Sequence, residues 1–456
     1  MEEIVRTIRC QNMNVPGTLG KVTTAIGKIG VSIGNIITIH QGSHFVIRDI
    51  EVYAEDEDKL KQIVKELSKL KETTILQVRD DVMETHKFGK IKMVSNIPIT
   101  SVDVLRRVYT PGVAQVCKLL EKEPGWKDYF TAIPYMVAIV TDGTAILGLG
   151  DIGPVAGMPV MEGKAALLQQ CVGVSGIPIL LDTKDPDVIV DTVKRIAPTF
   201  SGIHLEDIAS PRCFYIEDRL ANELSIPVMH DDQKGTAVVV LGALINACKM
   251  AKINLQEAKI GMIGLGAAGL AIGKFIFQYT GNPLLGTART EASIKRHVQA
   301  GGVSSTVDEI MQKAEIVIAT TGVKGLIDPG KVRKGQIIFA LTNPYPEITP
   351  EAARAAGAAI AADGRSVNNL LGYPGIWRGT LDVRASKINY EMLKAASLAI
   401  AASADEGMFV PSAVEPKVHL AVTHAVARAA MESGVAQRKL DDDYFASTDC
   451  KEPLWV

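Results

Sequence analysis

The sequence has little net charge of either sign. Its 456 residues carry 49 basic and 51 acidic side chains, which leaves a formal net charge of −2. Because nucleic acids and anionic membranes attract proteins mainly through excess basic charge, this balance gives no electrostatic reason to expect either partner. Hydrophobic residues make up 47 % of the chain, which is typical of a soluble globular protein.

Cysteine is scarce, and no long hydrophobic run is present. The six cysteines include no Cys-x-x-Cys pair, which in a chain of this size predicts reduced thiols and a cytoplasmic location. The start, Met1 to Arg6, lacks the basic and apolar segments of a secretory signal. The longest apolar stretch, Ala237 to Cys248, is interrupted by Gly242 and Asn246 and is too short to span a bilayer.

Residues 1–80 are predicted to form a small domain of their own, because a chain this long exceeds one ordinary core. Alternation and helical periodicity give the order βαββαβ, which is that of a ferredoxin-like fold. The predicted strands are 5–10, 33–40, 44–53 and 74–78, and the helices are 18–29 and 57–70. The polar stretch 79–92 is predicted to be a linker that is partly helical.

The rest of the chain alternates apolar strands with helical patterns, which predicts parallel α/β sheets covered by helices. We expect an α/β catalytic domain at 81–235 and a Rossmann-type dinucleotide-binding domain with C-terminal helices at 236–456. The predicted strands are 136–141, 177–182, 202–205 and 228–230 in the first domain, and 259–264, 283–286, 316–320, 337–341 and 359–361 in the second. Alanine-rich helices are predicted at 395–404 and 418–431.

A glycine-rich turn follows the strand 259–264 and precedes an apolar helix. Its residues are Gly264, Leu265, Gly266, Ala267, Ala268 and Gly269. In such a turn the first glycine permits a tight bend, the second lets a pyrophosphate approach the backbone, and the third lets the helix pack on the strand. The free N–H groups of the helix start then face the phosphates. The context predicts a dinucleotide site, the alternative being glycines that serve packing alone.

The residue that follows the next strand bears on which dinucleotide binds. An acid at this point would hold the 2′-hydroxyl of NAD, but the sequence has Arg289 and no carboxylate until Glu291. An arginine fits a 2′-phosphate better, so the sequence favours NADP over NAD. Arg289 as an ordinary solvated charge is the alternative.

Two acidic clusters follow short apolar strands of the first α/β domain. Neighbouring side chains of a strand point to opposite faces, so Glu206 and Asp207 can share an ion only where the strand ends and the chain turns. Asp231 and Asp232 meet the same condition one strand later. Carboxylates without cysteine or a clear histidine pair favour Mg²⁺ or Mn²⁺ over zinc. A solvated turn or a helix cap is the alternative for either pair alone.

Several further residues have plain structural interpretations when taken one at a time. Lys164 follows a glycine at an expected helix start, where a lysine is usually solvated. Tyr109 precedes Pro111 and Gly112 and can be a buried turn tyrosine. Asn368 and Asn369 precede a glycine and would ordinarily be turn residues.

The N-terminal domain resembles an ACT domain, a module that senses small molecules. The resemblance rests on its βαββαβ order, on Asn-x-Pro-Gly-x-Leu-Gly from Asn14 to Gly20, and on Asn35 in the next strand. It implies an effector pocket near Asn14, Gly17 and Asn35, usually at a dimer interface, and hence allosteric regulation. The alternative is that Pro16 and Gly17 form only a tight turn into a helix.

The larger part of the chain resembles malic enzymes of the shorter bacterial or archaeal type. The matching motifs cover about residues 90 to 385 in the family's order. They are Tyr109-Thr-Pro-Gly-Val-Ala114, Thr141-Asp-Gly143, Leu147-Gly-Leu-Gly-Asp151, Met161-Glu-Gly-Lys164, His204-Leu-Glu-Asp-Ile208, His230-Asp-Asp-Gln-x-Gly-Thr236, Leu341-Thr-Asn-Pro344, Asn368-Asn369, Tyr373-Pro-Gly375 and Arg378-Gly379.

The resemblance implies a role for individual residues. It implies that Glu206, Asp207 and Asp232 bind a divalent metal. It also implies that Lys164 is the general base, that Tyr109 is the general acid and that Asp231 supports the base. Asn343 and Asn369 match positions that hold the substrate carboxylate, with Asn343 and Asn368 also on the cofactor side.

These residue types suit the oxidative decarboxylation of L-malate to pyruvate. A lysine whose pKa is lowered by its surroundings can accept the C2 hydroxyl proton as hydride leaves to NAD(P). A divalent cation polarises the ketone so that CO₂ can leave, and a phenol or its relay partner protonates the enol carbon. The resemblance also implies a homodimer or larger homo-oligomer.

The chain departs from its larger eukaryotic counterparts at Ala145, where those enzymes have an arginine that grips the substrate carboxylate. Lys234 also stands where many relatives have a neutral residue or histidine. Two other functions remain open: a metal-independent amino-acid dehydrogenase, and a catalytically inactive sensor of nucleotide and effector. Activity that survives chelation would favour the first.

Overall fold

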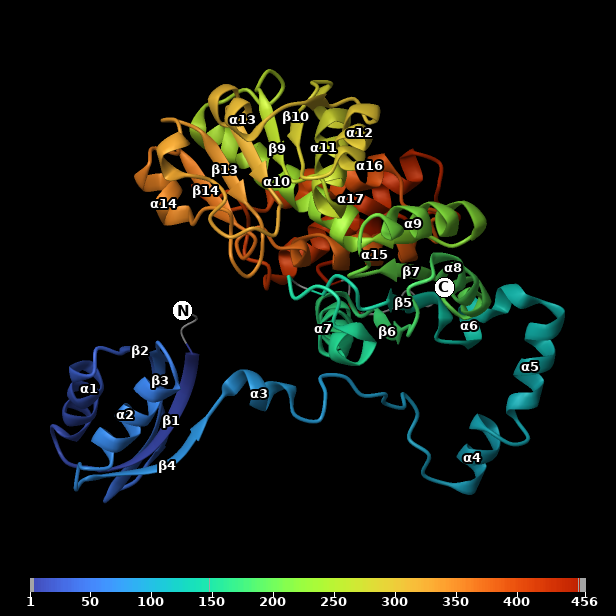
Figure 1. The fold of residues 1–456 in the computed structure, drawn as a ribbon. Helices are drawn as coiled ribbons and strands as arrows, with labels where there is room; N and C mark the ends of the chain where they lie inside the picture. Colours follow the sequence, from blue (N-terminus) through green and yellow to red (C-terminus); the bar gives the residue numbers. More distant parts are fainter. Residues whose placement is uncertain (1–3, 147, 450, 452–456) are drawn as a thin grey trace. The chain divides into compact units, whose positions relative to one another are not determined.

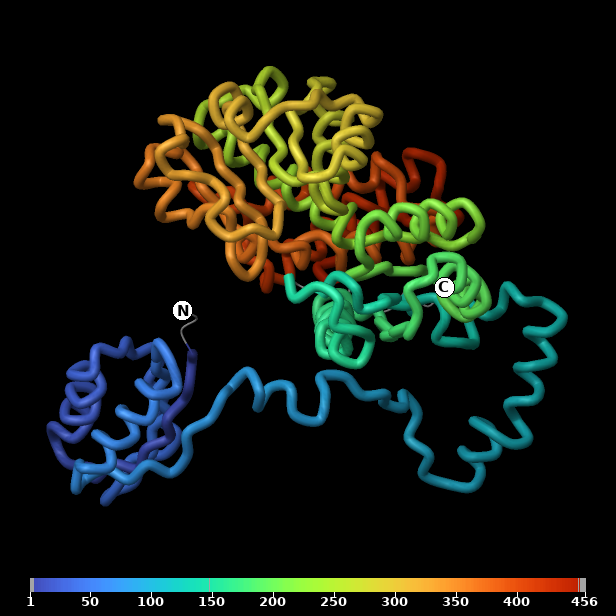
Figure 2. Tube along the Cα trace, viewed as in Figure 1, coloured from blue at the N-terminus to red at the C-terminus, as the bar shows by residue number. Residues whose placement is uncertain are grey.

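The computed structural model describes residues 4–146, 148–449 and 451, so Leu147 and Cys450 lie outside the described residues. The chain forms two compact units, Met1–Lys92 and Met93–Val456, which we call the N-terminal and the C-terminal unit (Figures 1 and 2). The division falls at the end of the predicted linker and not at its start. The linker contains one short helix, α3 (Asp81–His86).

The N-terminal unit is a four-stranded antiparallel sheet with two helices packed on one face. Its elements are β1 (Ile4–Met13), α1 (Thr18–Lys28), β2 (Ser32–Gln41), β3 (Phe45–Ala54), α2 (Glu57–Leu67) and β4 (Thr73–Arg79). The strand order is β2-β3-β1-β4. Alternate residues of β1, such as Ile8 and Cys10, join Val22 and Ile63 of the helices in one core. The opposite face is polar, with Arg9 and Arg79 each 2.7 Å from a carboxylate oxygen of Asp49.

The C-terminal unit begins with helices that bury little. These are α4 (Val102–Val108), α5 (Val113–Lys122) and α6 (Lys127–Phe130), with short 3₁₀ turns at Pro124–Trp126 and Ile133–Tyr135. None of the three helices has a buried residue. We call residues 93–130 the arm.

A four-stranded parallel sheet follows the arm, and we call it the catalytic sheet. Its strands are β5 (Met136–Thr141), β6 (Ser175–Leu180), β7 (Gly202–Leu205) and β8 (Val228–His230), in the order β6-β5-β7-β8. Three helices connect them: α7 (Gly153–Val172), α8 (Pro186–Ile196) and α9 (Arg212–Glu223). Three of the four strands have the predicted bounds, while β6 lies two residues earlier because Ser175 and Gly176 pair with β5.

A second parallel sheet, which we call the nucleotide sheet, has the strand order β11-β10-β9-β12-β13-β14. The strands are β9 (Ile260–Ile263), β10 (Leu285–Thr287), β11 (Val303–Ser304), β12 (Ile316–Ala319), β13 (Ile337–Ala340) and β14 (Ile360–Asp363). Its helices are α11 (Ala267–Thr280), α12 (Glu291–Gln299), α13 (Val307–Lys313) and α14 (Pro350–Ala355). This order is that of a Rossmann fold, with its ligand crevice between β9 and β12. The sequence missed β11, which is too short for an alternating pattern.

The two sheets share helices and a hydrophobic core. A π-helical turn, η4 (Asp231–Gly235), continues directly into α10 (Thr236–Ala251), so the predicted boundary at 235/236 falls inside one helical segment. By length and composition, 231–251 would pass as a membrane span, but 67 % of the tested window is buried within the protein, as in a core helix. α15 (Tyr373–Asp382), α16 (Tyr390–Ala402) and α17 (Pro416–Glu432) share its core, and α18 (Asp442–Ala446) follows.

Candidate active site

A cleft of about 500 Å³ opens where the carboxyl ends of both sheets meet. α7 and η4 border it on the side of the catalytic sheet, and the start of α11 borders it on the other. The cleft collects nine of the residues that the sequence singled out. They are Ala145, Lys164, Glu206, Asp207, Asp232, Ala268, Asn343, Asn368 and Asn369.

Three carboxylates converge in this cleft because the chain turns sharply after β7. β7 ends at Leu205, and two residues later Asp207 has a left-handed backbone, with φ of 52°. Its N–H donates to Asp232 Oδ2 at 2.8 Å, and its carbonyl accepts from Ala145 N–H at 2.9 Å. Oxygen atoms of Glu206, Asp207 and Asp232 consequently lie within 4.8 Å of one another. A left-handed aspartate costs about 1–2 kcal/mol, which these two hydrogen bonds help to offset.

The three carboxylates have the chemistry of a hard-cation site. Burial, with the Glu206 carboxylate nearby, raises the pKa of Asp232 to about 6. Burial would also raise the pKa of Glu206, but Lys164 and His204 overcome it and lower that pKa to about 2. An all-oxygen set of this charge fits Mg²⁺ or Mn²⁺.

Lys164 lies in the middle of α7 and not at a helix start, with its side chain only 11 % exposed. Its Nζ is 2.5 Å from Asp231 Oδ2 and 3.1 Å from Glu206 Oε1, and it lies 4.5 Å from the ring centre of Tyr373. Asn369 Nδ2 donates to the same Asp231 oxygen at 2.7 Å. Asp231 therefore contacts both the lysine and the amide of Asn369.

The expectation of a lowered lysine pKa is wrong for this arrangement. Burial alone would lower the pKa of Lys164, but the carboxylates of Asp231 and Glu206 outweigh it and raise that pKa above its ordinary value. The lysine is therefore protonated while both carboxylates face it. A change at one of them is required before it can act as a base near neutral pH.

Tyr109 is not part of the cleft within this chain. It follows α4 in the arm, and 68 % of it is exposed. The structure therefore separates the predicted acid from the predicted base. Other exposed apolar residues of the arm include Leu105, Val108, Trp126, Tyr129 and Phe130.

The glycine-rich turn requires glycine at two of its positions and has open space at a third. Gly264 has φ of +99°, and a Cβ there would lie 2.5 Å from Thr320 O. A Cβ at Gly269 would overlap Gly264 O, while the space beside Gly266 is open. Gly266 caps α11, whose first residues are Ala267 and Ala268. Arg289 follows β10 and is exposed.

Three functional side chains escaped the reasoning from sequence. Tyr373 belongs to a quoted motif but received no role, and Trp377 and Glu217 were not named at all. Glu217 is buried, accepts from His230 N–H at 2.9 Å and pairs with Lys234 Nζ at 2.9 Å. Lys234 thus points to α9 and not to the carboxylate cluster. The signal for Glu217 was its place among apolar residues at helical spacing.

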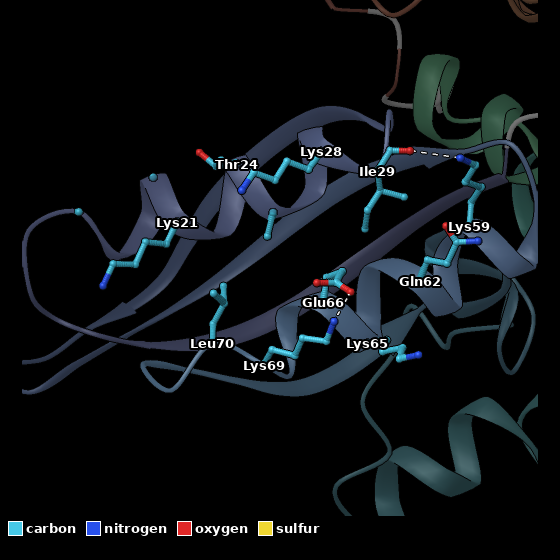
Figure 3. Close-up of a pocket in the computed structure, with 13 residues that line it drawn as sticks. Lys21, Thr24, Lys28, Ile29, Lys59, Gln62, Lys65, Glu66, Lys69 and Leu70 are labelled. Carbon is cyan, nitrogen blue, oxygen red and sulfur yellow. Dashed lines mark hydrogen bonds and ion pairs between the residues drawn. The ribbon is translucent and has the colours of Figure 1, made fainter.

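Two of the three predicted effector residues of the N-terminal unit lie outside a groove on its surface. Asn14 Nδ2 donates to Gly42 O at 2.8 Å, and Asn35 Nδ2 donates to Glu51 Oε2 at 3.0 Å. A groove of about 960 Å³ runs between α1 and α2 (Figure 3). Of the three residues, only Gly17 lines it. Its charged lining residues are Lys21, Lys28, Lys59, Lys65, Lys69 and Glu66.

Comparisons with known proteins point to one family. The family described as "Malic enzyme, N-terminal domain" matches residues 88–221. NAD-dependent malic enzyme 1 of Bacillus subtilis is 55 % identical over 432 residues, 94 % of this chain and 98 % of the relative. The NAD-dependent malic enzyme of Geobacillus stearothermophilus is 40 % identical and covers 95 % of both chains.

Solved structures give the same result for the fold. The malic enzyme of Pyrococcus horikoshii aligns with a TM-score of 0.75 at 40 % identity, over 80 % of this chain and 93 % of that one. The NAD-dependent malic enzyme of Thermotoga maritima aligns with a TM-score of 0.72 at 38 % identity, over 76 % and 99 %. With relatives this similar over nearly their whole length, the chain belongs to the malic enzyme family.

Proposed function

We propose that this chain catalyses the oxidative decarboxylation of L-malate to pyruvate and CO₂ with reduction of a nicotinamide dinucleotide. One observation carries the proposal: a single cleft holds three carboxylates, a buried lysine and amide side chains between the two sheets. Glu206, Asp207 and Asp232 would hold Mg²⁺ or Mn²⁺. The bound cation would supply positive charge that polarises the oxygen at C2 of the substrate.

Lys164 is the proposed base for the C2 hydroxyl proton. Its raised pKa depends on two carboxylates, and one of them, Glu206, is a metal ligand in this proposal. Engagement of Glu206 in metal binding weakens its pull on the lysine proton, which brings the lysine closer to a working base. Asp231 and Asn369 keep Nζ in position throughout.

The amides on the far side of the cleft are proposed to orient the substrate and the cofactor. Asn343 and Asn369 would bind the substrate carboxylates, and Asn343 and Asn368 would contact the nicotinamide side. Among the described residues that line the cleft, Lys164 is the only one with a basic side chain. The amides would therefore bind the substrate carboxylate that an arginine binds in the larger eukaryotic enzymes, at the position where this chain has Ala145.

NAD is the proposed dinucleotide, bound on Gly264, Gly266, Ala267, Ala268 and Gly269. The relatives that are 55 % and 40 % identical are both named NAD-dependent, whereas an NADP-dependent relative from Escherichia coli is 35 % identical. This ranking outweighs Arg289, which favoured NADP. The exposed Arg289 is then a solvated charge next to the ribose site.

The general acid is proposed to be Tyr109 of a second copy in a homodimer. The arm exposes Tyr109 together with several apolar side chains, and its helices bury none of their residues. Exposed apolar surface of this kind marks an interface. A second copy that covers the arm would bring the phenol to the partner's cleft.

Mixing two inactive variants tests this arrangement. Tyr109→Phe and Lys164→Ala are co-expressed and compared with each variant alone. If the tyrosine acts across the dimer, the mixture regains part of the wild-type turnover, because mixed dimers contain one complete site. No recovery in a mixture shown by native mass spectrometry to contain mixed dimers would contradict the arrangement.

The N-terminal unit is proposed to be an ACT-like, ferredoxin-like regulatory domain that binds an anionic effector. Five lysines and one glutamate line the groove between α1 and α2. Lys69 pairs with Glu66 and Lys21 pairs with Glu72, which leaves the others to attract an anion. Figure 3 shows these lysines on both helices around the groove. Lys28→Gln with Lys65→Gln should reduce any effect of pyrophosphate on malate saturation, while Lys61→Gln, outside the groove, should not.

The proposed reaction is tested by malate-dependent reduction of NAD and of NADP, with Mn²⁺ and after chelation. We expect turnover with malate that stops on chelation and returns with Mn²⁺, and NAD to be the better acceptor. Turnover of an amino acid that survives chelation would support an amino-acid dehydrogenase. Binding of dinucleotide without turnover of malate would support an inactive sensor. The free cysteines of the described residues suit a reducing cytoplasm, which we propose as its location.

A further inference from the structure

We propose that His204 and Trp377 are positioning residues that fix the metal ligand Glu206 so that only its Oε1 faces the cation. Trp377 Nε1–H donates to His204 Nδ1 at 2.8 Å. His204 Nε2 lies 2.7 Å from Glu206 Oε2. His204 and Trp377 are fully buried and Glu206 is 3 % exposed. The inference rests on the proposed metal site and deepens it.

The indole determines which nitrogen of His204 carries the proton. An indole N–H can only donate, so His204 Nδ1 must accept and cannot be protonated. The proton of the neutral ring is therefore on Nε2, which donates it to Glu206 Oε2. The hydrogen bonds thus run in one direction, from Trp377 through His204 to the carboxylate. A protonated ring would lose the bond from Trp377.

The same bonds remove His204 from the set of metal ligands. His204, Glu206 and Asp231 also lie close enough to one another to hold an ion. However, both ring nitrogens of His204 are engaged, and Asp231 Oδ2 is engaged by Lys164 and Asn369. Glu206 Oε2 accepts from His204, which leaves Oε1, 3.1 Å from Lys164 Nζ, as the carboxylate oxygen that His204 does not hold. Glu206 is therefore a ligand through one oxygen.

The fold makes room for this chain of hydrogen bonds. Gly202, His204 and Glu206 alternate along the catalytic sheet at β7, so they point to the same face. A Cβ at Gly202 would overlap the Trp377 ring, so glycine is required there for the indole to reach His204. Tyr373 packs edge-on against the imidazole, with ring centres 5.6 Å apart. The imidazole consequently has no room to turn.

Binding of Mn²⁺ to the metal-free protein, followed by electron paramagnetic resonance, tests the proposal without any turnover. His204→Leu should raise the Mn²⁺ dissociation constant about 10- to 100-fold, the usual effect of removing a group that orients a metal ligand. His204→Gln keeps a donor for Glu206 and should recover part of the loss. Trp377→Phe keeps the ring but removes the indole N–H, and should weaken Mn²⁺ binding by less than His204→Leu.

A second buried histidine provides the control. His419 on α17 is 1 % exposed, and its Nε2 donates to Ala413 O at 2.9 Å. His419→Gln perturbs one buried hydrogen bond too, but should leave the Mn²⁺ dissociation constant unchanged.

Two results would overturn the proposal. The first is a folded His204→Leu protein with the wild-type Mn²⁺ affinity. The second is a loss of affinity that follows the fall in melting temperature equally in the His204 and His419 variants. If His204→Leu does not fold, Trp377→Phe decides, since unchanged Mn²⁺ affinity in that variant also contradicts the relay. Failure of wild-type protein to bind Mn²⁺ at all would instead contradict the proposed metal site.

Discussion

The catalytic sheet and the nucleotide sheet contribute to one cleft in opposite ways. Glu206 and Asp207 follow β7, and Asp231 and Asp232 follow β8, so the catalytic sheet supplies charge. β9 ends in the glycine turn, so the nucleotide sheet supplies backbone N–H groups and open space. Like charges repel one another beside the catalytic sheet, whereas the nucleotide sheet depends on backbone conformations that only glycine adopts readily. Substitutions beside the catalytic sheet should therefore change catalysis and metal binding, and those in the glycine turn should change stability and NAD binding.

Replacement of Lys164 should have the largest effect on activity. Lys164→Ala removes the proposed base and should reduce kcat about 10²- to 10⁴-fold. Lys164→Arg keeps a positive charge beside Asp231 and Glu206 but cannot accept a proton near neutral pH, so it should be nearly as inactive. Steady-state kinetics with malate measures both. Wild-type kcat in Lys164→Arg would contradict the assignment of the base.

Replacement of Asp207 should separate metal binding from stability. Asp207→Asn keeps a residue that tolerates the left-handed backbone but removes one of three clustered negative charges. We expect Mn²⁺ affinity to fall about tenfold or more, and the metal-free protein to become about 1 kcal/mol more stable as repulsion is relieved. Mn²⁺ titration and urea unfolding with EDTA measure the two effects. A decrease in both would show that the cluster is not strained by charge.

Replacement of glycine in the nucleotide sheet should act through the backbone. Gly264→Ala places a Cβ against Thr320 O at φ of +99° and should cost about 1–3 kcal/mol of unfolding free energy as well as NAD binding. Gly266→Ala meets open space and should leave stability near that of the wild type while it weakens NAD binding. Urea unfolding and NAD titration compare the pair. Equal stability of both variants would contradict this account.

Acid should affect the nucleotide sheet through a buried histidine. Burial lowers the pKa of His297, whose Nε2 donates to Leu284 O. Below the ordinary histidine pKa of about 6.5 the unfolded chain takes up a proton that the folded chain resists, so stability falls as pH falls through this range. His297→Gln should reduce the slope of unfolding free energy between pH 7 and pH 5. An unchanged slope in His297→Gln would contradict this account.

Most of the fold could be predicted from patterns among residues that are neighbours in the sequence. Short apolar strands gave the bounds of β5, β7 and β8, and the glycine turn located β9 and α11, because these signals depend only on neighbouring residues. The sequence also predicted that Glu206 and Asp207 need a turn, which the left-handed Asp207 provides. What it missed depends on contacts between distant residues. The pKa of Lys164 is set by Asp231, and the role of Trp377 is set by His204, far away along the chain.

The space left by Gly202 has a consequence for how this protein can be made. Trp377, Tyr373 and Asn369, which complete the surroundings of the catalytic sheet, all follow the whole nucleotide sheet in the chain. During translation the strands of the catalytic sheet emerge from the ribosome long before these residues are synthesised. A fragment that ends at Ala251 would expose the hydrophobic core that they cover. The surroundings of the catalytic sheet are therefore completed only when the C-terminal part of the chain has been synthesised. For the same reason we expect that the two sheets cannot be exchanged as separate modules.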